Sequence, residues 1–133
     1  MGKGKQFLKI AEKLNLRDCK NLPNEALRRT IVNRTYYGVL HTVAEELEKI
    51  GKFKRKRETP KIHSIVIGRL KSLCPLAGDW LEKLHELRKK ADYDLELPFR
   101  REDLKTSQFL AELILKEVNL CLSKYRWKIK KRR

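Results

Sequence analysis

The feature that most constrains the fold of this chain is an uninterrupted helical pattern at residues 27–50, LRRTIVNRTYYGVLHTVAEELEKI. Its apolar residues recur at the spacing of an α-helix and fall on one side, at Val32, Tyr36, Val39, Leu40, Val43, Leu47 and Ile50. The opposite side carries a row that a small bundle does not need for folding, made of Arg34, Gly38, His41 and Glu45. We therefore expect this second side to be covered by a partner helix or a second copy of the chain, and we look for function there.

Helical spacing predicts four further helices, at about residues 4–15, 59–74, 79–97 and 102–129. The helix at 79–97 is expected to begin at Asp79, which can cap it while Glu82 reaches back. Leu81 lies at the edge of its apolar stripe, and the stripe itself consists of Trp80, Leu84, Leu87 and Ala91. No stretch alternates with period two for long enough to predict a strand. The sequence thus indicates an all-α, up-and-down bundle of four to five helices.

Length and charge define the domain and the class of partner. The 133 residues suffice for one domain with a substantial core, which we place at residues 1–125, followed by a basic tail at residues 126–133. The 33 Lys and Arg against 17 Asp and Glu give a formal net charge of +16, which favours polyanions, nucleic acid before an anionic membrane. The residues expected to bind nucleic acid lie in a basic loop and in the tail: Lys52, Lys54, Arg55, Lys56, Arg57, Lys128, Lys130, Lys131, Arg132 and Arg133.

The sequence also predicts where the protein works and what it lacks. No apolar run approaches the roughly 18 residues of a membrane span, and the start of the chain has no hydrophobic segment suited to a signal peptide. We therefore expect a cytoplasmic protein without membrane contact. Three cysteines, Cys19, Cys74 and Cys121, are widely spaced with no CxxC pair, so neither a disulfide nor a zinc site is expected. No cofactor or metal ion is predicted.

Three short motifs, in this order, resemble those of the HEPN superfamily. Residues 34–41 look like its RxYYxxxH stretch, and residues 61–64 resemble the K-H-S element that opens the next helix in short stand-alone members. Residues 87–94 are similar to its R-x-x-x-D-Y signature. The matching positions are Arg34, Tyr36, Tyr37, His41, Lys61, His63, Ser64, Arg88, Asp92 and Tyr93. The resemblance covers about residues 5–125.

The resemblance implies a helical bundle that usually dimerises, with the polar motif residues gathered in a cleft at the dimer interface. Many HEPN proteins are metal-independent ribonucleases of toxin–antitoxin, CRISPR or phage-defence systems, and short members often sit beside a minimal nucleotidyltransferase. The resemblance therefore implies an RNA-binding homodimer that is a candidate ribonuclease toxin. A nucleotidyltransferase antitoxin is its candidate partner. This chain departs from the ribonuclease pattern, because no histidine follows Arg88, where the sequence reads Lys-Lys-Ala-Asp-Tyr-Asp.

The chemistry of RNA cleavage selects the candidate catalytic residues. Without a metal ion, the reaction requires a base for the 2′-OH, an acid for the leaving oxygen and a cation for the charge that grows on phosphorus. Histidine suits the first two roles and arginine the third. Since no histidine follows Arg88, the imidazole has to come from elsewhere, and His85 stands one turn before it on the same flank. The candidates are Arg34, His41, His63, Arg88, Asp92 and Tyr93.

Structural explanations compete with these roles. Arg34 can bridge helices by pairing with a carboxylate such as Asp92 or Glu45, because an arginine between packed helices is costly to leave unpaired. Arg88 and Asp92, four residues apart, can form an ordinary ion pair within one helix. The sequence thus leaves two functions open. One is a ribonuclease, and the other is a non-catalytic module that binds RNA or DNA, or docks a nucleotidyltransferase.

Overall fold

The computed structural model describes residues 4–10, 25–55 and 61–132, with the backbone alone for residues 128–132. Residues 4–10 are helical, and four longer helices follow: α2 (Glu25–Lys49), α3 (Ile62–Leu73), α4 (Pro75–Tyr93) and α5 (Arg101–Arg132). These parts of the chain contain no strand, so the predicted all-α class is confirmed for them. The predicted start of the third helix at residues 59 and 60 lies outside the described residues.

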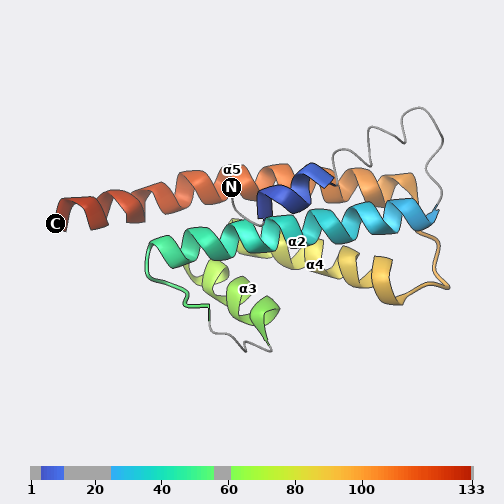
Figure 1. Cartoon of the computed structure of the whole chain (residues 1–133), viewed down its shortest axis with the longest axis horizontal. Coiled ribbons are helices and arrows are strands. Elements are labelled where there is room, and N and C mark those ends of the chain that lie inside the picture. Colours follow the sequence, from blue (N-terminus) through green and yellow to red (C-terminus); the bar gives the residue numbers. More distant parts are fainter. Residues whose placement is uncertain (1–3, 11–24, 56–60, 133) are drawn as a thin grey trace.

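The long helices lie side by side along the molecule (Figure 1). α2 and α5 run in the same direction, and α4 runs in the opposite direction. The short α3 lies below α2 in this view. An ion pair of 2.9 Å between Arg126 and Glu46 joins the C-terminal halves of α5 and α2. At the opposite end, Arg28 Nε donates to the carbonyl of Phe99, just before α5 begins. These contacts fix the parallel register of the two longest helices.

The predicted apolar side of α2 forms the centre of the core. All seven of its residues are buried, and Tyr36 is completely enclosed. The prediction for α4 was wrong in one respect: Leu81 is fully buried, while Trp80 is only partly buried and packs at the margin of the core. The buried face of α4 is centred on Ala77, Leu81, Leu84 and Arg88, so the helix turns Leu81, and not Trp80, towards the core.

The start of α4 is the clearest departure from the sequence prediction. The helix begins at Pro75, where the missing N–H of proline costs no hydrogen bond, and only Cys74 separates it from α3. Asp79 is therefore inside the helix and does not cap it. Glu82, the expected partner in the cap, instead forms an ion pair with Lys71 of α3. At its other end α4 stops at Tyr93, four residues before the predicted end.

The polar side of α2 is covered by the helical segment at residues 4–10, as expected for a partner helix. The contact is close: a Cβ on Gly4 would lie 2.6 Å from the carbonyl oxygen of Gly38, and one on Gly38 would lie 2.7 Å from Leu8 Cγ. Glycine at both positions lets the two backbones approach. The segment covers Gly38 and His41, whereas Arg34, one turn earlier, remains exposed.

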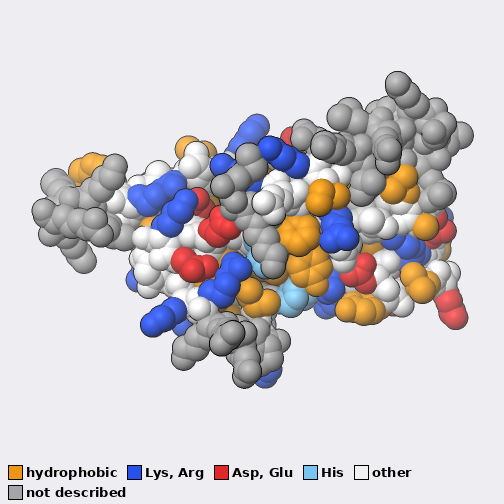
Figure 2. Space-filling model, viewed as in Figure 1, with side chains coloured by type: hydrophobic (Ala, Val, Ile, Leu, Met, Phe, Trp, Pro, Cys, Tyr) orange, Lys and Arg blue, Asp and Glu red, His pale blue; other side chains and the backbone are white. Residues whose placement is uncertain are grey.

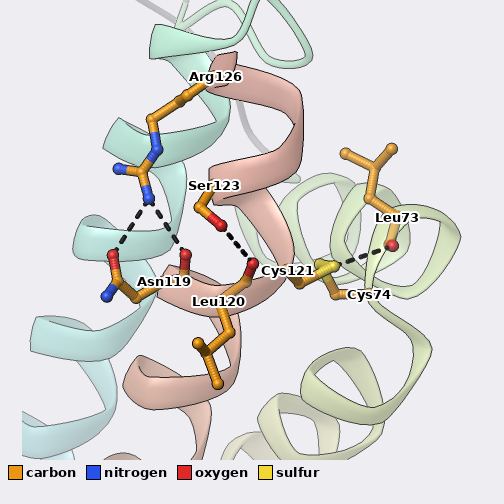
Figure 3. The surroundings of a disulfide bond; sticks show 7 residues. All are labelled: Leu73, Cys74, Asn119, Leu120, Cys121, Ser123 and Arg126. Carbon is orange, nitrogen blue, oxygen red and sulfur yellow. Dashed lines mark hydrogen bonds between the residues drawn. A yellow bond between two sulfur atoms is a disulfide. The ribbon is translucent and has the colours of Figure 1, made fainter. Parts of the chain in front are cut away.

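Contrary to the sequence prediction, Cys74 and Cys121 form a disulfide (Figure 3). They are separated by 47 positions in the sequence, and their Cα atoms lie 6.2 Å apart. Sequence spacing could not show this pair, because the fold alone brings the α3–α4 junction beside α5. The Sγ of Cys121 also lies 3.3 Å from the carbonyl oxygen of Leu73. Cys19 lies outside the described residues.

The disulfide is expected to stabilise the fold measurably. Replacing Cys74 and Cys121 by serine should lower the free energy of unfolding by about 2–4 kcal/mol, since the bond restricts the unfolded chain over a loop of this length. Urea unfolding followed by circular dichroism measures the effect, with Cys19→Ser as the matched control. Dithiothreitol should destabilise the wild type by the same amount and leave the double variant unaffected. Equal unfolding curves for wild type and double variant would contradict the assignment.

Candidate functional site

Tyr36 is the residue on which the three sequence motifs meet. Its ring stacks against His63 of α3 and His85 of α4, with centroids 5.6 and 5.1 Å away, and the guanidinium of Arg88 lies 5.9 Å from it. The two imidazoles are parallel to within 2°, with centroids 5.1 Å apart. Histidine side chains reach the surface near the middle of the face in Figure 2, beside hydrophobic and Lys or Arg side chains. We call Tyr36, His63, His85 and Arg88 the tyrosine cluster.

The protonation states of the cluster follow from its burial. Burial raises the pKa of the Tyr36 hydroxyl well above its usual range, so it keeps its proton. It lies 2.7 Å from Nδ1 of His63, and this hydrogen bond orients the imidazole. Partial burial, and then the charge of Arg88, lower the pKa of His63. Burial, followed by the neighbouring His63, also lowers the pKa of His85. Both imidazoles are therefore neutral at pH 7 and able to accept a proton.

Arg88 is held by a network that joins α2 and α4. Its guanidinium donates to the hydroxyl of Tyr37 at 2.7 Å, and its Nε lies 2.8 Å from Oδ2 of Asp92, an ion pair without hydrogen-bond alignment. Asn33 donates to the same carboxylate oxygen at 2.8 Å. The hydroxyl of Tyr93 lies at 3.5 Å, and the guanidinium is 5.4 Å from the Tyr93 ring, which is 68% exposed. The network fixes the guanidinium at the edge of the cluster, beside an accessible aromatic ring.

Two candidates from α2 lie outside this cluster. The exposed Arg34 lies with its guanidinium 5.7 Å from the ring of Phe7. His41 stacks on the same ring, with the two ring centroids 5.7 Å apart. The alternative role of Arg34, an ion pair with Asp92 or Glu45, is not found among the described residues, and Asn33 and Arg88 are the side chains at the Asp92 carboxylate. Of the six candidate catalytic residues, the structure brings together His63, Arg88, Asp92 and Tyr93, and it places Arg34 and His41 against the N-terminal segment.

Several residues that form or support the site were not among the predicted site residues. His85 could be anticipated from its place one turn before Arg88, whereas nothing in the sequence distinguishes Asn33. Arg29 is the least predictable, since it acts on the backbone: its buried guanidinium donates to the carbonyls of Lys90 and Ala91 at 2.9 and 3.0 Å. Both carbonyls belong to the last turn of α4, and that of Lys90 also accepts from the N–H of Asp94 at 3.2 Å. Arg29 thereby holds in place the turn that carries Asp92 and Tyr93.

The described start of the basic loop and the C-terminal part of α5 lie towards the same end of the bundle. Lys52 and Lys54 are exposed just after α2, and Lys124 is exposed on α5, which continues past α2 at this end (Figure 1). We call these three lysines the basic end. Arg55, also predicted to bind nucleic acid, pairs with Glu48 at 3.4 Å. The other predicted residues fall outside the described residues or side chains: Lys56, Arg57, Lys128, Lys130, Lys131, Arg132 and Arg133.

The arrangement supplies the groups that phosphodiester chemistry uses. Two neutral imidazoles can exchange protons, and a fixed guanidinium can stabilise negative charge on a phosphate. The exposed Tyr93 offers a flat face on which an unpaired base can stack. Within the described part of the chain, no three metal-ligating side chains are grouped in a way that could hold an ion.

None of the described helices combines the length and apolarity needed to cross a membrane. Comparison of the chain with protein-family models, with curated proteins and with solved structures finds no match.

Proposed function

We propose that this protein is a cytoplasmic RNA-binding protein of the HEPN type and a candidate metal-independent ribonuclease of a toxin–antitoxin or defence system. One observation carries the catalytic part: Arg88 and two neutral histidines, His63 from α3 and His85 from α4, surround Tyr36. In this proposal His63 or His85 takes the proton of the 2′-OH, and the other protonates the leaving oxygen. Arg88 stabilises the charge on phosphorus.

The departure from the usual ribonuclease motif is compensated in this proposal. No histidine follows Arg88 in the sequence, but His85 precedes it by one turn and His63 reaches the same tyrosine from α3. Both imidazoles are therefore near the guanidinium without the usual spacing. A phosphate bound between them would favour the protonated form of one imidazole, because an anion raises the pKa of a neighbouring histidine.

RNA binding rests on a separate observation, the charge of +16 and its distribution. The basic end offers cationic side chains to the phosphate backbone, while Tyr93 and the tyrosine cluster lie further along the bundle. A single strand that contacts both would pass its phosphates across the basic end and present one linkage to the cluster. The partners that we propose are single-stranded RNA, a second copy of this chain and a nucleotidyltransferase antitoxin.

A second function is favoured by the closed network around Arg88. A hydrogen bond to Tyr37 and an ion pair with Asp92 hold the guanidinium between α2 and α4, as expected for an arginine that holds helices together. The protein would then be a non-catalytic module that binds nucleic acid or a nucleotidyltransferase through the same charged surface.

Cleavage in the presence of a chelator distinguishes the two functions. Purified protein is incubated with a mixed pool of single-stranded RNA in EDTA, and the products are resolved by gel electrophoresis. A ribonuclease of this type yields fragments with 2′,3′-cyclic phosphate ends, because the 2′-OH is the nucleophile. Saturable binding of intact RNA would favour the non-catalytic module, and no binding at low salt would contradict both.

A further inference from the structure

The hydroxyl of Tyr36 decides which nitrogen of His63 carries a proton. Tyr36 is completely buried, and its hydroxyl lies 2.7 Å from Nδ1 of His63. Within the described parts of the chain, this nitrogen is the only hydrogen-bond partner of the hydroxyl. A buried hydroxyl proton that found no acceptor would make such an arrangement about tenfold rarer. The hydroxyl therefore donates, and Nδ1 accepts.

This hydrogen bond fixes the tautomer of His63. A neutral imidazole carries one proton, so the ring whose Nδ1 accepts has its proton on Nε2. No lone pair of the neutral ring is then left for a substrate. Nε2 forms no hydrogen bond within the described residues and is not one of their enclosed polar atoms. Histidine side chains reach the surface in this region, so the Nε2–H is placed to donate to a bound phosphodiester (Figure 2).

His85 has the opposite freedom. Its ring stacks on that of His63, with centroids 5.1 Å apart. Among the described residues, neither of its ring nitrogens has a hydrogen-bond partner, and neither is an enclosed polar atom. No hydrogen bond to these residues fixes its tautomer, so one nitrogen of the neutral ring remains available to take a proton.

We propose that Tyr36 is a positioning residue that divides the catalytic roles: it holds His63 as the donor to the leaving oxygen and leaves His85 as the base. This inference rests on the proposed ribonuclease activity, and it assigns the two roles that the activity leaves open. The tyrosine itself does not touch the RNA. It acts through the imidazole that its hydroxyl holds.

The protons balance under this assignment. His85 takes the proton of the 2′-OH as the 2′-oxygen bonds to phosphorus, and the bond from phosphorus to the 5′-oxygen breaks with its electron pair on that oxygen. The 5′-oxygen takes the Nε2 proton of His63 while Nδ1 takes the hydroxyl proton of Tyr36, so no imidazolate forms. An alkoxide is a stronger base than the tyrosinate that replaces it, and His85 and Arg88 lie beside the Tyr36 ring. Water then carries the proton of His85 to Nε2, and Nδ1 returns its proton to Tyr36.

The direction of one pKa change tests the tautomer in the absence of RNA. Nuclear magnetic resonance titration of the full-length protein gives the pKa of His63 in wild type and in Tyr36→Phe. A hydroxyl that donates to Nδ1 favours the neutral imidazole, so its removal should raise the pKa of His63, which is roughly a three- to tenfold increase in the protonation constant. If Nδ1 instead donated to the hydroxyl, the charged form would be favoured, and the same variant would lower this pKa.

The matched control is Tyr125→Phe, which removes a tyrosine hydroxyl from α5 and should leave the pKa of His63 unchanged. Nitrogen chemical shifts of the wild-type ring should also show the proton on Nε2. Circular dichroism shows whether Tyr36→Phe keeps the fold. A wild-type proton on Nδ1, or a pKa of His63 that falls or stays the same in Tyr36→Phe, overturns the proposal.

The pH profile of RNA cleavage tests the division of roles. Wild-type cleavage needs neutral His85, so its rate should rise with pH through the pKa of His85 and then stay level. In Tyr36→Phe, His63 has to be charged to act as an acid, so the rate should fall above the pKa of His63 and the profile should become bell-shaped. The other titratable and charged groups that face the two rings are the same in both proteins: Tyr37, Glu86, Arg88 and Lys89.

Profiles of the same shape for wild type and Tyr36→Phe overturn the division of roles. Absence of cleavage by the wild type overturns the proposed function and the catalytic roles together. The tautomer of His63 is measured on the RNA-free protein, so its failure is distinguishable from the failure of the proposed function.

Discussion

Replacing Arg88 by alanine is expected to reduce metal-free RNA cleavage by about 10²–10³-fold, comparable to the loss of one stabilising donor in other phosphate or acyl transfers. The reason is that the guanidinium is fixed beside both imidazoles and supplies the cation for the charge that develops on phosphorus. Arg88→Lys keeps the charge but loses the planar fork, and should restore only part of the rate. Initial rates on a labelled RNA oligonucleotide in EDTA measure the effect.

The matched control is Arg69→Ala, which removes an exposed arginine from α3 and should leave the rate unchanged. Circular dichroism checks that Arg88→Ala is folded, because this side chain also links α2 and α4. His63→Ala and His85→Ala should each reduce the rate by about 10²–10⁴-fold, the usual contribution of a general acid or base. Equal cleavage by wild type and all these variants would mean that a contaminating nuclease acts or that the site is elsewhere.

The affinity for single-stranded RNA is expected to fall by about 10²–10⁴-fold between 50 and 200 mM salt, if six to ten phosphates are neutralised at once. Each neutralised phosphate releases condensed counterions, so the logarithm of the binding constant falls linearly with the logarithm of the salt concentration. Fluorescence anisotropy with a 20-nucleotide RNA gives this slope. A flat response to salt would contradict electrostatic binding.

A charge-matched pair of variants locates the binding surface. Replacing Lys52, Lys54 and Lys124 by glutamine removes the basic end and should reduce the salt slope by about two units, at roughly 0.7 per phosphate contact. Replacing the exposed lysines Lys5, Lys83 and Lys105 removes the same charge from other parts of the molecule and should change the slope much less. Equal effects of the two variants would mean that net charge, and not the basic end, determines binding.

Periodicity predicted the core of α2 because a long amphipathic helix has few other ways to bury its apolar side. Every residue that the pattern assigned to this side is buried, and the segment at residues 4–10 covers Gly38 and His41 of the row on the other side. The cluster residue Tyr36 was nevertheless predicted only as core. Its ring does fill the core, but its hydroxyl reaches His63, and helical spacing cannot separate the two ends of one side chain.

Contacts between distant segments could not be predicted from local patterns. The predicted start of α4 at Asp79 is wrong because residues 79–82 match a capping box, while Pro75, directly after the predicted third helix, is the residue that begins α4. The disulfide depends on how the α3–α4 junction meets α5, which no spacing encodes. Likewise, Asn33 and Arg34 differ by one position, and only the rotation of α2 against α4 decides which of them faces Asp92.

The most direct test of the account is whether RNA contacts His63 and His85. The chain has three histidines, so nuclear magnetic resonance can follow each imidazole while 2′-O-methyl RNA, which lacks the attacking hydroxyl, is added. The account predicts saturable shifts of the His63 and His85 signals and a rise in the pKa of at least one, because a bound phosphate stabilises its protonated form. Unchanged His63 and His85 signals at saturating RNA, with shifts confined to the basic end, would contradict it.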